Sequence, residues 1–229
     1  MVLQSRAIHS EEKASRRADI VAAAGRLLTR DPENFASVAQ VAEEAGLAKG
    51  TVYLYFKTKE EMLMALHTEH AMAMFDGMDA VLSLPPGQVT PELITDGFVA
   101  FVRANPLFLH TAAICHSSLG RNIDPQLLFE HQKTIAMRLH RSGSLLLQRF
   151  PSFAARGPMA GMDFLHHAFS YAIGTWQLCD PQHAHNCSAS PEHLDVPPEM
   201  AVFVRDVYAD LRTGLLALWY GMAGNLPKA

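Results

Sequence analysis

The chain has 229 residues and a net charge of −4; hydrophobic residues make up 49 % of it and charged residues only 18 %. This balance excludes disordered, collagen-like and coiled-coil chains. The low charge fraction indicates that much of the surface becomes covered by a core, a pocket or a partner subunit.

No membrane segment or secretion signal is expected. The longest stretches without Asp, Glu, Lys or Arg are 104–120 and 164–179. Both are shorter than the roughly 20 apolar residues that a spanning helix needs. The first 15 residues lack the apolar core and cleavage site of a signal peptide. The three cysteines cannot all pair within the chain, which fits a reducing compartment, so we expect a cytoplasmic protein.

The apolar pattern predicts an all-α chain. Apolar residues recur at spacings of three and four, with Pro, Asn and Gly between the periodic segments. The first helix ends near Asp31-Pro32. The second begins after Ser37, which forms a capping box with Gln40, and stops at Gly46. A third, short helix begins near Lys49 and buries the side chains of Val52 and Phe56.

Further capping signals divide the rest of the chain. Thr58 and Glu61 form a second capping box, which opens a long helix that ends before Pro85-Pro86-Gly87. Three later helices each begin with a capping residue followed by proline; the pairs are Thr90-Pro91, Asn105-Pro106 and Asp124-Pro125. Two C-terminal helices have the strongest apolar stripes; they run around 162–176 and 200–218, and a His-, Pro- and Ser-rich loop joins them.

The second and third helices form a helix-turn-helix, because Gly46 between them tolerates the left-handed backbone of a tight turn. A helix of this kind fits the DNA major groove, and its outward side chains near the N-terminus reach base edges. Lys49 can donate to guanine acceptors, and Gly50 lets the backbone approach closely. Thr51, Tyr53 and Lys57 suit phosphate oxygens.

Residues 37–61 closely resemble the DNA-binding domain of the TetR family of bacterial transcriptional regulators. The most diagnostic part is the string Lys-Gly-Thr-Val-Tyr-Leu-Tyr-Phe-Lys-Thr-Lys-Glu at 49–60. The resemblance implies an all-helical homodimer with an N-terminal three-helix DNA-binding domain. A variable C-terminal domain would bind a small effector and dimerise through its last two helices. We therefore divide the chain into a DNA-binding domain at 1–57 and an effector-binding and dimerisation domain at 58–229.

Carried over position by position, the resemblance implies that Ser37, Thr51 and Lys59 contact phosphates. Lys49, Gly50, Tyr53 and Tyr55 would lie at the groove. Two positions depart from the family pattern. Ala48 stands where many members have serine, so one helix cap is absent, and Tyr55 stands where histidine is common, which bears on base preference.

The N-terminal arm before the first helix contains Arg6, Lys13, Arg16 and Arg17. We expect it to be a disordered tail. The alternative is an arm that adds phosphate or minor-groove contacts.

The C-terminal two thirds of the chain favour an apolar effector cavity, because they are poor in charge and rich in Phe and Met. An ordinary solid core is the alternative, since Phe and Met at helical spacing are core residues more often than ligand contacts. His166 and Arg138 are the polar groups that would orient a ligand. The complete set of candidate ligand contacts is Phe98, Phe101, Phe108, Met137, Arg138, His166, Phe169 and Trp176.

Other chemistries find less support. Cys115 is expected to be a small core residue rather than a redox switch. The cluster Cys179, His183, His185, Cys187 and His193 has ligand types that suit zinc or copper, but its spacing matches no recognised pattern. We therefore predict no metal site and no cofactor, and keep a metal- or thiol-responsive regulator as the alternative. No enzyme motif is present.

Taken together, the sequence predicts a ligand-responsive transcriptional regulator, most simply a repressor. Its partners would be a double-stranded DNA operator, a small apolar or amphipathic effector and a second copy of the chain. No membrane partner is expected.

Overall fold

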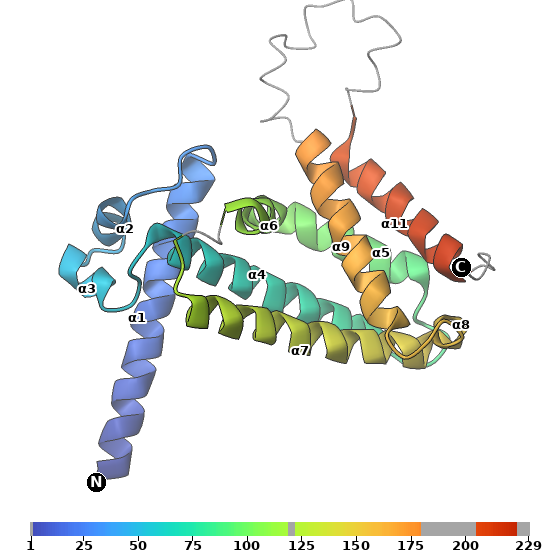
Figure 1. The fold of residues 1–229 in the computed structure, drawn as a ribbon, viewed down its shortest axis with the longest axis horizontal. Coiled ribbons are helices and arrows are strands. Elements are labelled where there is room, and N and C mark those ends of the chain that lie inside the picture. Colours follow the sequence, from blue (N-terminus) through green and yellow to red (C-terminus); the bar gives the residue numbers. More distant parts are fainter. Residues whose placement is uncertain (1, 119–121, 180–204, 224–229) are drawn as a thin grey trace, which may run out of the picture. The chain divides into compact units, whose positions relative to one another are not determined.

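The computed structural model of this chain describes the backbone of residues 2–118, 122–179 and 205–223, and the side chains of 11–115, 122–179 and 205–222. Within these ranges all regular structure is helical and no strand occurs, which confirms the predicted all-α class (Figure 1). The helices in chain order are α1 (Val2–Arg30), α2 (Val38–Glu44), α3 (Lys49–Tyr53), α4 (Lys59–Leu82), α5 (Pro91–Ala104), α6 (Leu107–Ser118), α7 (Pro125–Arg149), α8 (Pro151–Ala154), α9 (Ala160–Cys179) and α11 (Val207–Ala223).

The chain forms two compact units. The first unit consists of residues 1–70 and 114–132, and the second of 71–113 and 133–229. Helices α4, α6 and α7 therefore each contribute residues to both units. The functional division at residue 57 stays a prediction, because compactness alone assigns no function to either unit.

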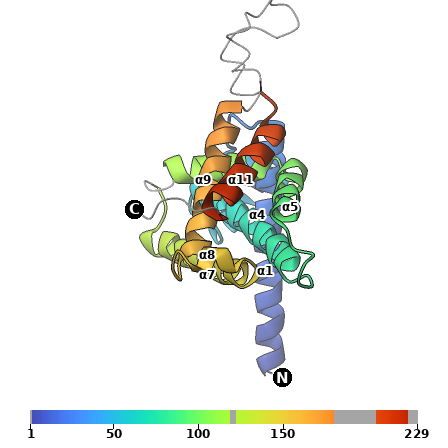
Figure 2. The ribbon, with the colours of Figure 1, turned by 90° about the vertical axis from the view of Figure 1, so that its right-hand side faces the viewer.

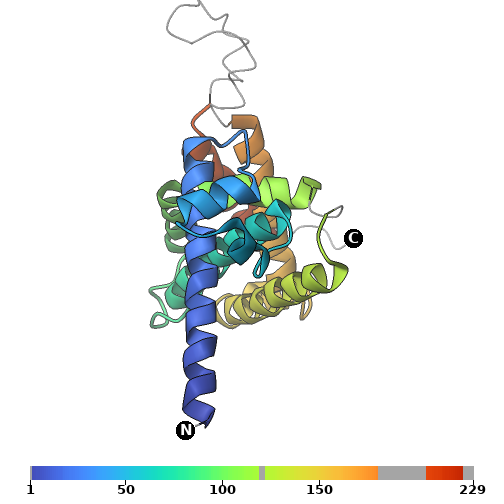
Figure 3. The same cartoon turned by 90° about the vertical axis from the view of Figure 1, so that its left-hand side faces the viewer.

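The first unit is built on α1, which packs against α2, while α2 packs against α3 (Figure 3). The apolar stripe of α1 is fully buried at Ile20, Val21 and Ala24, as are Val41 of α2 and Val52 of α3. Removing these side chains from water supplies most of the stabilisation, since α2 and α3 are too short to persist alone.

An ion pair network also joins α1 to α2. The carboxylate of Glu44 accepts from Arg26 Nε at 2.7 Å and from Arg30 Nη1 at 2.8 Å. The guanidiniums of Arg26 and Arg30 hold the pKa of the Glu44 carboxyl below its usual value. The pair is solvent-exposed, so it orients α2 more than it stabilises the fold.

Both ends of α2 have the predicted caps. The Ser37 hydroxyl accepts from the Gln40 amide, and the Gln40 side chain accepts from the Ser37 amide at 2.9 Å, which completes the capping box. At the other end Gly46 has φ +66°, and the Leu47 amide donates to the Ala42 carbonyl at 2.8 Å. This is the left-handed helix termination that glycine favours, and it turns the chain toward α3.

The second predicted capping box differs in one bond. The Thr58 hydroxyl accepts from the Glu61 amide at 3.2 Å, as expected. The Glu61 carboxylate, however, accepts from the Lys57 amide at 2.7 Å, one residue before the cap. The result is still a satisfied start to α4, and Glu61 itself is buried.

The structure corrects two expectations about the first unit. The N-terminal arm is helical from Val2, so the prediction of a disordered tail is wrong. The third helix ends at Tyr53, and Phe56 is buried just beyond it rather than on its inward face. Phe56 still packs inside because the Phe56 amide continues the turn by donating to the Val52 carbonyl at 3.0 Å.

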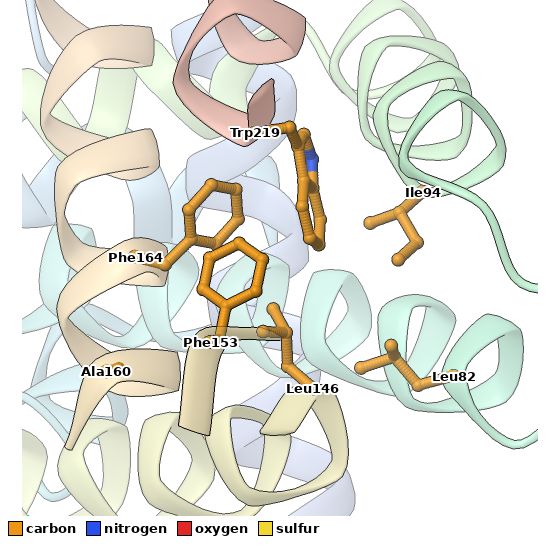
Figure 4. Close-up of a cluster of buried hydrophobic side chains, with 7 residues drawn as sticks. All are labelled: Leu82, Ile94, Leu146, Phe153, Ala160, Phe164 and Trp219. Atoms are coloured by element: carbon orange, nitrogen blue, oxygen red, sulfur yellow. The ribbon is translucent and has the colours of Figure 1, made fainter. Parts of the chain in front are cut away.

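The second unit has two buried apolar clusters. One joins α4, α5, α7, α8, α9 and α11, and at its centre the ring of Phe153 meets those of Phe164 and Trp219 edge to face (Figure 4). The other joins α4, α5, α6, α9 and α11 around the fully buried Phe108 and Leu211. Figure 2 shows α9 and α11 side by side, and both clusters use the faces that these two helices turn inward. The short helix α8 had no signal in the sequence, and α11 begins at Val207; residues 200–204 of the predicted helix lie outside the described residues.

Close backbone contact fixes how α7 meets α9. A Cβ atom built on Gly161 would collide with the carbonyl oxygen of Gly143, and one built on Gly143 would lie 2.8 Å from the amide nitrogen of Met162. Only glycine fits at both positions, because the obstructing atoms belong to backbone and cannot rotate away.

Among the described residues, no single helix is long and apolar enough to cross a bilayer. The bent pair of Pro91–Ala104 and Leu107–Cys115 meets the length and composition test, with an angle of 88° at the break. Val102, Phe108 and Leu109 of this pair are buried in the second unit.

The Gly143–Gly161 contact predicts a stability effect. Gly161→Ala should lower the free energy of unfolding by at least about 2 kcal/mol, because the new methyl group overpacks a backbone contact. Gly97→Ala is the control, since a Cβ there meets nothing within 4 Å; it should be neutral or stabilise by about 0.5–1 kcal/mol. Urea unfolding followed by circular dichroism measures both. Equal stability of the two variants would contradict the assigned helix contact.

Candidate nucleic-acid interface and effector region

Helix α3 exposes the side chains that the sequence assigned to DNA. Val52 is fully buried and anchors the helix, so Lys49, Gly50 and Tyr53 are left facing solvent. The Tyr53 side chain is 46 % exposed, and the Lys49 ammonium lies 5.8 Å from the centre of its ring. Ala48 occupies the N-cap without a side-chain hydrogen bond, as its residue type predicts. The first amides of α3 are thus uncapped by any side chain, and uncapped helix amides favour anions.

A surface hollow gathers residues from three separate helix starts. It is lined by Ser37, Val38, Ala39, Lys49, Tyr53, Thr58, Lys59 and Glu60. Four of the eight predicted DNA contacts, Ser37, Lys49, Tyr53 and Lys59, therefore surround one hollow although they span 23 positions of sequence. The arrangement combines two ammonium groups, a phenol and hydroxyls, which can donate to phosphate oxygens. The Glu60 carboxylate also lines the hollow and accepts from the Asn122 amide at 3.3 Å.

The other four predicted contacts lie beside this hollow along the chain. Gly50 and Lys57 are exposed, and Thr51 and Tyr55 are half-buried. The Lys57 ammonium lies 3.8 Å from the Asp124 carboxylate, so part of its charge is already neutralised within the first unit. Lys57 is therefore the weakest of the predicted phosphate contacts.

Sequence reasoning missed two residues of this surface. Thr58 lines the hollow in addition to capping α4. Leu54 is 78 % exposed directly after α3. A single exposed leucine is common on protein surfaces, so the exposure of Leu54 alone assigns it no role. The alternation of buried Val52 and Phe56 would have indicated that Leu54 points outward.

In the second unit, the predicted effector contacts divide into two groups. Phe98, Phe101, Phe108, Phe169 and Trp176 all belong to one apolar cluster. The rings of Phe98, Phe101 and Phe169 surround Phe108, with centroid distances of 6.3, 5.3 and 6.0 Å. Five of the eight candidates therefore lie together, and their role as effector contacts stays a prediction.

The remaining three candidates lie outside that cluster. Met137 is 64 % exposed, and His166 is exposed on α9. The Arg138 guanidinium is paired with Asp76 at 2.5 Å and lies 3.5 Å from Asp79, a buried carboxylate that also accepts from the Ser142 hydroxyl. Arg138 therefore holds α7 to α4 within the second unit. None of these three residues belongs to the aromatic cluster around Phe108.

The cysteines and histidines singled out for metal binding are only partly described. His183, His185, Cys187 and His193 lie outside the described residues. Cys179 ends α9, with its sulfur 3.7 Å from the Asp210 carboxylate. Within the ranges that the structure describes, no group of three His, Cys, Asp or Glu side chains is arranged to hold a metal ion.

Cys115 is buried, as predicted for a core residue. Burial raises the pKa of its thiol to about 12, because the interior disfavours the thiolate.

A helix-turn-helix unit followed by a larger helical unit defines the class of this molecule as a helix-turn-helix protein. Comparison with known families gives its place within that class. Residues 20–66 match the model of bacterial regulatory proteins of the tetR family, and residues 68–225 match the tetracyclin repressor-like C-terminal domain. The chain belongs to the TetR family of bacterial transcriptional regulators.

Sequence relatives match only short segments. The fatty acid metabolism regulator protein of Bacillus subtilis (strain 168) is 32 % identical over 69 residues, which are 30 % of this chain and 36 % of that protein. An uncharacterized HTH-type transcriptional regulator of Haemophilus influenzae (strain ATCC 51907 / DSM 11121 / KW20 / Rd) is 48 % identical over 44 residues, or 19 % of this chain and 24 % of that protein. The matches thus span well under half of these relatives.

Solved structures are similar over nearly the whole chain. The fatty acid degradation regulator FadR from Bacillus halodurans has a TM-score of 0.57 at 16 % identity, covering 89 % of this chain and 94 % of that one. FadR from Bacillus subtilis in complex with stearoyl-CoA has a TM-score of 0.51 at 18 % identity, covering 88 % and 96 %. At these identities the likeness shows the fold alone.

The raised pKa of Cys115 predicts low reactivity. At pH 8 the thiol stays protonated, and only the thiolate attacks alkylating reagents. Iodoacetamide should modify Cys115 at least about 100-fold more slowly in the folded protein than in urea, where its pKa returns to about 8.5. Peptide mass spectrometry over a time course measures this ratio. Equal rates in the two conditions would contradict the burial of this residue.

Proposed function

We propose that the protein is a DNA-binding repressor that occupies its operator as a homodimer in the cytoplasm and leaves it when a small apolar or amphipathic molecule binds. The observation that carries the DNA-binding part is the hollow where Ser37, Lys49, Tyr53 and Lys59 meet. Membership of a regulator family supports the same conclusion and gives no support to an enzyme.

Each residue of the interface has a role in this proposal. Ser37, Thr51 and Lys59 bind phosphates and so fix the position of α3 on the duplex. These phosphate contacts do not distinguish one base sequence from another. Lys49 and Tyr53 lie at the groove, where Lys49 donates to guanine acceptors. Gly50 lets the α3 backbone approach closely because it has no side chain and nothing within 4 Å of a Cβ position.

A homodimer completes the binding site. Two α3 helices about 34–36 Å apart would enter successive major grooves on one face of the duplex, so a pseudo-palindromic operator is expected. Apolar side chains on α9 and α11 that remain partly exposed in the single chain, among them Ile173, Leu216 and Tyr220, support pairing through these helices.

The aromatic cluster around Phe108 supports an apolar effector. Rings from α5, α6 and α9 meet there, and the His110 imidazole contacts the Trp176 ring at the border of the cluster. Stearoyl-CoA is bound by the Bacillus subtilis structure of the same fold, and the N-terminal relative is a fatty acid metabolism regulator. We therefore place long-chain fatty acyl compounds first among the effectors to be tested.

The effector acts only through its different affinity for two conformations of the dimer. A coupling of about 1–3 kcal/mol between the effector and operator sites is typical. Helix α4 contains residues of both units and is the direct covalent connection between the α3 segment and the second unit. A conformational change in the second unit can therefore reach the α3 segment through α4.

The direct test is selection of genomic DNA fragments by the purified full-length chain, with sequencing of what is retained. Enrichment of a pseudo-palindromic site supports the proposal, together with a mass from light scattering that corresponds to a dimer. Retention of no sequence above background, or a strictly monomeric protein on the operator, would overturn it.

Tyr53 gives a mutational prediction. Tyr53→Ala should weaken binding to the selected operator by roughly 1–3 kcal/mol, because a groove contact is lost. Phe129→Ala is the matched control: Phe129 is also an exposed aromatic of the first unit, yet does not line the hollow. Fluorescence anisotropy at constant salt measures both affinities. An unchanged affinity for Tyr53→Ala would contradict the residue assignment.

The effector region gives a second prediction. Saturating long-chain acyl-CoA should weaken operator binding at least about tenfold, the equivalent of 1.4 kcal/mol of coupling. Phe169→Ala should reduce this response and leave affinity without effector unchanged, whereas Met137→Ala should change neither, since Met137 lies apart from the aromatic cluster. A titration of acyl-CoA and free fatty acid into the protein–operator complex measures the response. No response to either compound would exclude this effector class.

A further inference from the structure

Helix α1 is longer than the DNA-binding domain requires. It begins at Val2, whereas the match to the family's DNA-binding domain begins at residue 20. The 18 residues before position 20 extend the helix by about 27 Å at 1.5 Å per residue. Figure 3 shows α1 running past α2 and α3, with its N-terminal half projecting beyond them.

The described side chains of this extension are all exposed. Every residue from 11 to 19 is exposed, and Ile20 is the first buried one. The only apolar side chains in this stretch are Ala14 and Ala18. Residues 11–19 therefore have no large apolar group to insert into a lipid interface or a protein groove, and what this part of the extension can recognise is charge.

The cations of residues 11–19 lie toward one side of the helix. Lys13, Arg16 and Arg17 have spacings of three and four, which place them on one face. The same spacing continues to Ile20 and Ala24, the face that packs inward in the rest of α1. Glu12 and Asp19 lie four residues before and three residues after Arg16, so these two acids border the cationic face beside Arg16. The cationic face of the extension thus continues the side of α1 that packs inward.

The cations at the two ends of α1 differ in whether they are paired with a carboxylate. Arg26 and Arg30 at the C-terminal end are both neutralised by Glu44. In contrast, Lys13 and Arg16 form no ion pair or hydrogen bond with any side chain or backbone group that the structure describes. Their positive charge remains available to an external anion.

Arg17 connects this basic face to the recognition segment. Its guanidinium lies 4.9 Å from the ring centre of Phe56, three residues after the end of α3. Arg17 therefore packs on the ring that follows the recognition helix, and its charge also acts on the carboxyl of Glu69 in α4.

We propose that the N-terminal extension of α1 is a second DNA-binding element, which binds backbone phosphates that flank the operator half-site through Lys13 and Arg16. This inference rests on the proposed function. An extension of about 27 Å corresponds to about eight base pairs at 3.4 Å per base pair. Phosphate contacts of this kind add affinity and no sequence preference.

The experiment compares the full-length wild type with Lys13→Gln/Arg16→Gln on the selected operator within a long duplex, by fluorescence anisotropy from about 50 to 200 mM salt. Each lost phosphate contact should lower the salt slope by about 0.9, so the variant's slope should fall by about 2 per protomer. Affinity should weaken by at least about tenfold, and protection of the flanking backbone in hydroxyl-radical footprints should disappear.

Arg103→Gln/Arg156→Gln is the matched control, because it removes two exposed cations of the second unit, which has no DNA contact in the proposal. Its salt slope and footprint should equal those of the wild type. Trimming the duplex to the two half-sites should weaken the wild type and leave Lys13→Gln/Arg16→Gln unaffected.

The outcomes separate this inference from the proposed function. If the wild type retains the operator and Tyr53→Ala loses it, but Lys13→Gln/Arg16→Gln keeps the wild-type slope and footprint, the extension does not bind DNA and the inference is overturned. An equal loss of slope in both double variants would also overturn it, since the effect would then be one of net charge. If the wild type binds no DNA, the proposed function itself fails.

Discussion

The burial of Val52 is the constraint on which the DNA-binding surface depends. Helix α3 has five residues, and an isolated helix of that length does not persist in water. Tertiary packing has to supply its stability, and Val52 is its one fully buried side chain. Because that side chain faces inward, Lys49, Gly50 and Tyr53 must face outward. The Ser37 cap and the left-handed Gly46 then set where α3 starts. The geometry of the interface is therefore a consequence of the core of the first unit.

The second unit is held by contacts of a different kind. At the Gly143–Gly161 crossing the backbones of α7 and α9 touch, and such a contact tolerates no adjustment. Nearby, the buried Asp79 accepts from the Ser142 hydroxyl and lies within ion-pair distance of Arg138 and Arg141, which fixes α7 against α4. The aromatic cluster around Phe108 is held mainly by side-chain packing, with polar groups at its border: the His110 ring lies 5.4 Å from that of Trp176, and the Tyr171 hydroxyl donates to the Asp210 carbonyl at 2.9 Å.

The sequence contained most of the fold because local chemistry determines where these helices begin. Ser37 and Thr90 both cap helices at the residues where their types predicted it. The extension of α1 could not be predicted from apolar periodicity, because residues 11–19 have no apolar stripe. The candidate effector contacts were harder to predict from the sequence. Phe98 and Phe169 were grouped correctly by composition, but the pattern could not show that Met137 faces solvent, or that Arg138 is occupied by Asp76. Those two facts depend on which face of α7 meets α4, and only the tertiary packing fixes that.

The net charge of the chain is a poor guide to whether it can bind DNA. A total of −4 disfavours nucleic acid when taken over the whole chain. Screening, however, limits each charge to about 8–10 Å at physiological salt, so a phosphate senses only nearby groups. What decides binding is whether local cations are already paired. Glu44 pairs with two arginines at one end of α1, and Asp124 lies beside Lys57. These cations are therefore less available to a phosphate. Lys13, Arg16, Lys49 and Lys59 are exposed on the first unit without such a carboxylate partner among the described residues. A chain with a negative net charge can therefore have a basic surface where its cations lack a carboxylate partner. For phosphate binding by the first unit, the pairing of individual charges matters more than their sum.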